Sequence, residues 1–153
     1  MYDIRDVVQK AIGLSVRKKE IYEQQCQRVD DPGLQLVIRI IVKQIDKDIE
    51  HYQAIIANIS NEMAEAIDFG TYDKISSLVN QFANVMIAPD LQTRHDFMTF
   101  VIALEESLYA LLIDIQGRMV VNEVVASSVS YYVLSELIEE KDDFVKKLKT
   151  FSV

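Results

Sequence analysis

An aspartate and a histidine one helical turn apart, Asp48 and His51, are the first side chains in this sequence whose spacing could support chemistry. Residues at positions i and i+3 share one face of a helix, so a carboxylate oxygen and an imidazole nitrogen can reach one ion. Asp48 falls inside an apolar stripe between Ile45 and Tyr52, where a carboxylate is costly unless it is paired or bound to metal. The pair therefore indicates a metal site, with an exposed histidine beside carboxylates as the simpler alternative.

Two glutamates are placed in the same way on other predicted helices. Glu105 follows Val101 by four positions, and Glu140 follows Leu137 by three, so both fall within apolar stripes. Carboxylates on the core faces of three helices, together with one histidine, favour a shared polar site over a solvated surface. The alternative is that each carboxylate lies at the edge of its stripe and reaches solvent.

Hydrophobic periodicity predicts long helices that would carry these residues. The expected helices cover residues 3–29, a stretch from Pro32 that ends before Gly70, a weaker stretch over 71–88, residues 93–116 with a stop at Gly117, and a last stretch from Asn122 almost to the carboxyl end. The stripes expected to face the core include Ile4, Val8, Ala11, Ile12, Val16 and Tyr22 in the first helix, and Tyr132, Leu137, Phe144 and Leu148 in the last. With only four glycines and two prolines, the chain has too few turn residues for an all-β or α/β protein.

The two halves of the chain are alike. Residues 11–15 align with residues 101–105, and residues 46–51 align with residues 138–143. Each half would be a helical hairpin, and the weaker helix would lie in a long crossover between the hairpins. The expected fold is all-α, a four-helix bundle of two helical hairpins in a single domain over residues 1–153.

The hairpins resemble the ferritin-like di-iron carboxylate proteins, in particular the rubrerythrins. The first and third helices of that family carry Ala-Ile-x-x-Glu, and its second and fourth carry Glu-Glu-x-x-His. Ala11-Ile12-Gly13-Leu14-Ser15, with Asp30-Asp31-Pro32 after it, is similar to the family's first helix and turn. Ile45-Asp46-Lys47-Asp48-Ile49-Glu50-His51-Tyr52 is similar to its second-helix motif. The resemblance covers both hairpins and leaves out the crossover.

This resemblance implies an iron or manganese site. Its ligands would be Asp48, His51, Glu105, Glu140 and Asp143. Asp48 stands where the family has a glutamate, Asp143 stands where it has a histidine, and Ser15 replaces the glutamate of the first helix. Since one carboxylate and one histidine are missing, the resemblance implies one ion rather than two, or none, and residual iron oxidation or peroxide reduction. No catalytic residue is assigned, and whether the protein is an enzyme stays open.

Composition limits the partners. With 24 acidic and 16 basic residues, the net charge of -8 disfavours nucleic acid. No apolar stretch approaches the roughly 18 residues that a membrane span needs, and the amino terminus lacks the pattern of a signal peptide, so a cytoplasmic protein is expected. Rubrerythrins also carry an iron domain on four cysteines, and because Cys26 is the only cysteine here, redox activity would need an external electron donor.

A second hypothesis is a helical bundle that binds no metal and acts as a binding or structural module. It rests on the departures at Ser15 and Asp143 and on the apolar content of the crossover. The crossover residues that would form a partner surface are Val79, Phe82, Val85, Met86 and Ile87. A homodimer is expected under either hypothesis.

Overall fold

A computed structural model describes residues 1–119 and 128–151 of the chain. This part of the chain is all-α and contains the helices α1 (Ile4–Arg28), α2 (Pro32–Asn58), α3 (Phe69–Val85), α4 (Arg94–Met119) and α6 (Val129–Phe151). The all-α class predicted from periodicity is confirmed. No helix in the described ranges is long and apolar enough to cross a membrane.

The helix ends are fixed by short polar side chains. Asp3 caps α1, where its carboxylate accepts a hydrogen bond from the backbone N–H of Arg5 at 2.8 Å. Asp31 caps α2 by accepting from the N–H of Gly33 at 2.9 Å, and Pro32 is the first helical residue, which confirms the predicted start.

Two other predicted boundaries are the end of a helix at Gly117 and the start of a helix at Asn122. The stop predicted at Gly117 is wrong, because α4 continues to Met119. Glycine costs a helix about 1 kcal/mol, and Ile115 and Met119, on either side of Gly117, pack against the core and hold the last turn in place. The start predicted at Asn122 lies outside the described residues.

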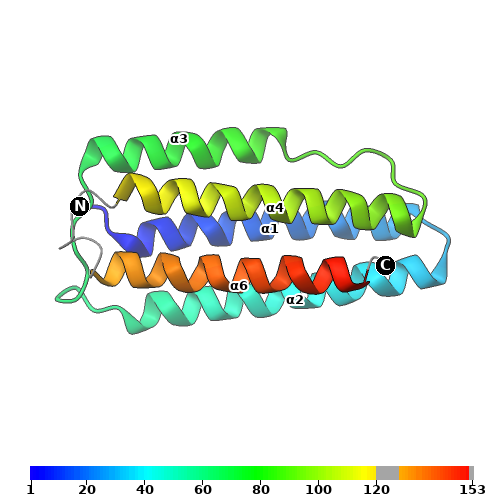
Figure 1. Cartoon of the computed structure of the whole chain (residues 1–153), viewed down its shortest axis with the longest axis horizontal. Helices are drawn as coiled ribbons and strands as arrows, with labels where there is room; N and C mark the ends of the chain where they lie inside the picture. Colours follow the sequence, from blue (N-terminus) through cyan, green and yellow to red (C-terminus); the bar gives the residue numbers. More distant parts are fainter. Residues whose placement is uncertain (120–127, 152–153) are drawn as a thin grey trace.

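The long helices run side by side along the length of the molecule (Figure 1). α1 packs mainly on α2, and α4 packs mainly on α6, while α3 lies against α1 and α4. The chain start is joined to the segment before α3, since the N–H of Ile67 donates to the carbonyl of Tyr2 at 2.7 Å. The ring of Tyr2 also stacks on that of Tyr72 at 3.8 Å between centroids.

The apolar interior is divided into two groups of buried residues. The first core group includes Leu14, Tyr52, Leu108 and Leu137. The second core group includes Tyr22, Ile45, Val101 and Leu148. Along α1, α2, α4 and α6, the chain passes from one group to the other near the middle of the helix, and the buried charged residues Lys18, Glu105 and Lys141 lie at this boundary.

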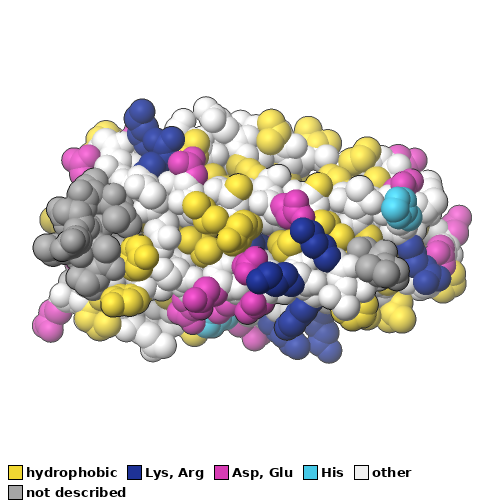
Figure 2. All heavy atoms as spheres, viewed as in Figure 1, with side chains coloured by type: hydrophobic (Ala, Val, Ile, Leu, Met, Phe, Trp, Pro, Cys, Tyr) yellow, Lys and Arg dark blue, Asp and Glu magenta, His cyan; other side chains and the backbone are white. Residues whose placement is uncertain are grey.

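Some residues of the predicted stripes lie elsewhere. Val16 is 42% exposed and Tyr132 is 63% exposed, so the prediction that they face the core is wrong. In α1 the buried face passes through Ser15 and Lys18 instead, because packing against α2, α3 and α6 sets the orientation of the helix. On the face seen in Figure 2, acidic and basic side chains lie close together around the middle of the molecule, with apolar patches between them.

Candidate functional site

Glu105 is the centre of a buried charged cluster. Its side chain is fully buried on α4, and each of its carboxylate oxygens accepts one hydrogen bond from a lysine ammonium group. Nζ of Lys18, from α1, lies 2.7 Å from Oε1, and Nζ of Lys141, from α6, lies 2.7 Å from Oε2. The side chains of Lys18 and Lys141 are only 2% and 7% exposed. We call these three residues the buried triad.

The buried triad lies at the boundary between the two core groups. On α4, Glu105 falls between Val101 of the second group and Leu108 of the first. Lys18 on α1 and Lys141 on α6 hold equivalent positions between residues of the two groups. Asp48, half-buried on α2, is near enough for its negative charge to raise the pKa of both lysines. Asp48 therefore adds a further negative charge near the two ammonium groups of the triad.

The pKa values in the triad follow from burial and from this pairing. Burial by itself would raise the pKa of Glu105, but the charges of Lys18 and Lys141 outweigh burial and hold it at about 2. Burial, reinforced by the positive charge of Lys141, lowers the pKa of Lys18 to about 8, although Glu105 opposes this shift. Burial would also lower the pKa of Lys141, but Glu105 dominates and raises it. At neutral pH all three residues are charged.

A small cavity adjoins the triad on the side of the first core group. Its volume is about 30 Å³, and its polar lining comes from Ser15, Lys18, Tyr52 and Lys141. A buried water needs roughly 10–15 Å³ of such space, so the cavity has room for about two waters. Each ammonium group donates one hydrogen bond to Glu105 and has further N–H donors that such waters can satisfy.

The interior does not suit a pair of metal ions. A di-metal centre needs carboxylate oxygens that are free to bind cations, with no competing positive charge. Here both oxygens of Glu105 are bonded to ammonium groups, and the remaining core position on α1 at this level holds Ser15. The lysines already supply the positive charges that metal ions would bring.

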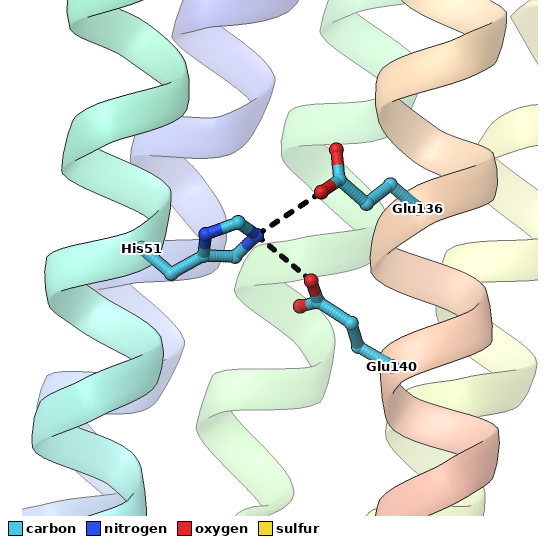
Figure 3. A group of neighbouring side chains, drawn as sticks. All are labelled: His51, Glu136 and Glu140. Atoms are coloured by element: carbon cyan, nitrogen blue, oxygen red, sulfur yellow. Dashed lines mark ion pairs between the residues drawn. The ribbon is translucent and has the colours of Figure 1, made fainter.

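A second cluster lies between α2 and α6, closer to the surface (Figure 3). His51 points from α2 toward α6, and Glu136 and Glu140, one helical turn apart, point back toward it. Nε2 of His51 lies 2.8 Å from Oε1 of Glu140 and 3.4 Å from Oε1 of Glu136. A metal site needs at least three His, Cys, Asp or Glu side chains with ligand atoms close together. In the part of the chain that the structure describes, this is the only such group whose ligand atoms all lie within 4.8 Å of one another. We call them the His51 cluster.

The atoms of the His51 cluster are held close without a complete set of hydrogen bonds. Nε2 of His51 is itself buried and lies close to Oε1 of Glu140, yet among the described residues no group accepts a hydrogen bond of normal geometry from it. Burial and the negative charges of Glu136 and Asp48 raise the pKa of Glu140, while His51 opposes that rise. A positive ion at this point would relieve the repulsion between the carboxylates.

Only three of the five predicted ligands belong to the two clusters. His51 and Glu140 come together, whereas Glu105 belongs to the buried triad. Oδ1 of Asp48 accepts a hydrogen bond from Gln44 at 3.0 Å, and Asp143 is exposed. The structure does not bring the five predicted ligands together at one point.

Sequence reasoning missed three residues of these clusters, Lys18, Lys141 and Glu136. Lys18 follows the buried Leu14 by four positions, and Lys141 follows the buried Leu137 by four positions. This helical spacing places both lysines on the core faces of their helices. Glu136 precedes Glu140 by one turn, a spacing that places two carboxylates on one face.

Comparison with protein-family models, with curated proteins and with solved structures gives no significant match for this chain. The sequence resemblance to rubrerythrins therefore has no independent support, and the two clusters are the features from which a function can be inferred.

Proposed function

We propose that this protein binds one divalent metal ion, iron or manganese, at the His51 cluster, within a ferritin-like four-helix bundle. In this proposal α1 with α2 and α4 with α6 are the two hairpins, and α3 belongs to the long crossover between them. The ion would bridge α2 and α6, with His51 as the nitrogen ligand and Glu136 and Glu140 as the oxygen ligands. An oxygen-rich set with one imidazole suits ferrous iron, manganese or zinc.

One observation carries the proposal: Nε2 of His51 is buried, forms no hydrogen bond of normal geometry with the described residues, and faces two carboxylates. An imidazole nitrogen in such a place can hold a proton or a metal ion. Burial raises the pKa of Glu140, and repulsion from Glu136 and Asp48 adds to that rise, so an ion with a larger charge than a proton is favoured between the two carboxylates.

The three side chains would leave the remaining coordination positions to water, because His51, Glu136 and Glu140 are each partly exposed. A bound ferrous or manganous ion would supply one-electron redox chemistry and activate a coordinated water. The protein would supply the charge that retains the ion, and any turnover would draw on an external electron donor.

The experiment is a metal titration of protein freed of metal with a chelator. Mn²⁺ is added and followed by electron paramagnetic resonance, and Fe²⁺ is added anaerobically and followed by elemental analysis after desalting. We expect one ion per chain. His51→Ala should abolish retention, and Glu136→Gln and Glu140→Gln should each weaken it by at least about 10- to 100-fold, the loss that follows when only a partner of a metal ligand is removed.

The matched control is His95→Ala, which removes the other histidine, an exposed residue of α4. This variant should bind as the unmodified protein does. Retention of less than a tenth of an equivalent by the unmodified protein, or equal loss in both histidine variants, would refute the proposal.

A second candidate is a bundle without metal that serves as a binding or structural module, and the buried triad is the observation that favours it. Glu105 is already neutralised by Lys18 and Lys141, so the fold has its internal cations without any ion from solution. Of the crossover residues, Val85 and Ile87 are 77% and 69% exposed and could contact a second copy, whereas Val79 and Met86 are buried.

Thermal melting with and without Mn²⁺ separates the two candidates, since an ion that binds only the folded state raises the melting temperature. A rise that His51→Ala removes favours the metal-binding protein. An unchanged melting temperature, together with a dimer by light scattering, favours the module.

A further inference from the structure

A groove of about 380 Å³ lies between the carboxyl-terminal half of α1 and the segment that follows α3, and its lining includes no residue of the His51 cluster. Its lining includes Arg17, Gln25 and Arg28 from α1 and Met86 and Ile87 from the α3–α4 connection. This volume falls within the usual range for sites that bind small molecules.

The most informative group in the groove is the side chain of Gln25. It is only 1% exposed, and its Nε2 donates a hydrogen bond to the carbonyl of Pro89 at 2.8 Å. This bond fixes the amide, yet its buried Oε1 has no hydrogen-bond partner among the described residues. A buried acceptor without a donor is unfavourable, so a ligand that carries an N–H group would satisfy this oxygen.

Two guanidinium groups give the groove a local positive charge in a chain of net charge -8. Arg17 is fixed in place, because its Nε donates to the carbonyl of Ala83 at 2.9 Å and its Nη2 to that of Met86 at 3.5 Å. Arg28 has no ion pair or hydrogen bond with the described part of the chain. Guanidinium groups bind carboxylates in a planar, two-point geometry.

The remaining lining sets the rest of the ligand's chemistry. Ile21 and Met86 offer apolar contact, and Met86 is a side chain that adapts to irregular shapes. Glu20, also in the lining, disfavours ligands with more than one negative charge. The groove therefore combines an acceptor for an N–H donor, a cation for one carboxylate and an apolar contact.

We propose that this groove binds small monocarboxylates that also carry an amide N–H and an apolar group, the chemistry of an N-acylated apolar amino acid. The N–H would donate to Oε1 of Gln25, the carboxylate would pair with Arg28 and Arg17, and the apolar group would lie on Ile21 and Met86. This site is separate from the proposed metal site and does not depend on it.

The test uses N-acetyl-L-leucine as the ligand and follows backbone amide shifts of the ¹⁵N-labelled full chain by NMR. We expect saturable binding with a Kd on the order of 1 mM, and shift changes centred on residues 24–28 and 86–88. Two analogues each lack one group: N-acetyl-L-leucinamide lacks the charge, and 4-methylpentanoate lacks the N–H. Each should bind roughly tenfold more weakly, the factor that about 1.4 kcal/mol gives.

Arg28→Gln should weaken binding of N-acetyl-L-leucine by about fivefold, since an exposed ion pair is worth up to about 1 kcal/mol. The matched control is Arg39→Gln, which removes the same charge from an exposed position of α2 outside the groove and should leave the Kd unchanged. No saturation by 20 mM ligand, equal effects of the two arginine variants, or equal binding of 4-methylpentanoate would overturn the proposal. A lost metal site would leave all of these results unaltered.

Discussion

Replacing Glu105 by glutamine tests whether the buried triad is one interdependent unit. The substitution keeps the shape of the side chain but removes the only negative charge bonded to Lys18 and Lys141, both of which are nearly inaccessible to water. Breaking a buried ion pair by removing one partner costs about 3–5 kcal/mol, because a charge is left buried without compensation. Here two ammonium groups lose their partner, so we expect the upper part of that range.

The assay is urea unfolding at pH 7, followed by circular dichroism at 222 nm. With a denaturant slope of about 2 kcal/mol per molar, a loss of about 4 kcal/mol lowers the midpoint by about 2 M. The matched control is Glu106→Gln, one residue further along α4, which removes an exposed ion pair between Glu106 and Lys149. Such a pair is worth about 0–1 kcal/mol, so the midpoint of the control should move by less than about 0.5 M.

A third variant separates the role of the charges from that of packing. Changing the triad together, with Lys18→Met, Glu105→Leu and Lys141→Met, removes all three charges and keeps similar volumes. Replacing a buried ion cluster by apolar residues is often neutral or stabilising by about 1–4 kcal/mol. The reasoning fails if Glu105→Gln is no worse than Glu106→Gln, or if the triple variant is as unstable as Glu105→Gln.

Further predictions concern pH and single polar groups. Because the pKa of Glu105 is held at about 2, below its ordinary value of 4.5, its contribution to the free energy of unfolding is present above pH 4.5 and should be lost, by about 3 kcal/mol, as acid titration approaches pH 2. Burial lowers the pKa of Lys18 to about 8, so between pH 8 and 10.5 the unfolded chain binds more protons than the folded protein does. The free energy of unfolding should therefore rise with pH across this window, and the rise should disappear in Lys18→Met. Tyr22→Phe should be neutral or stabilising by about 1 kcal/mol in urea unfolding, since the buried Tyr22 hydroxyl has no hydrogen-bond partner in the described structure. Glu65→Ala should lower the free energy of unfolding by about 1 kcal/mol, and with it the melting temperature, because the Glu65 carboxylate accepts hydrogen bonds from the N–H groups of Val129 and Ser130 at the start of α6. A shift in melting temperature as small as that of Glu62→Ala, an exposed neighbour, would contradict this role.

The helices were predictable because their signals are local. An aspartate before Pro32 and an apolar residue every three or four positions depend on nothing outside the segment, and both recur in the structure. The inward position of Glu105 was predictable for the same reason. What the period could not show is which groups from other helices would meet it.

The lysines of the triad were missed because lysine is rarely buried, and its place in an apolar stripe is usually explained by a flexible chain that reaches water. Only the packing of α1 and α6 on α4 shows that Lys18 and Lys141 have no route to solvent. The metal site was predicted from the carboxylates alone, and that prediction did not take into account the two buried lysines that already neutralise Glu105.

The buried triad also limits how this sequence can drift over time. A change at position 105 alone leaves two buried ammonium groups without a counter-charge, and a change at position 18 or 141 alone leaves one oxygen of Glu105 without its hydrogen bond, whereas a joint exchange of all three can leave the protein foldable. Homologues should therefore retain the three residues together or lack them together, and intermediates should be scarce. Since Lys18 lies on α1 and its partners lie on α4 and α6, the same constraint limits how far α1 can slide along those two helices.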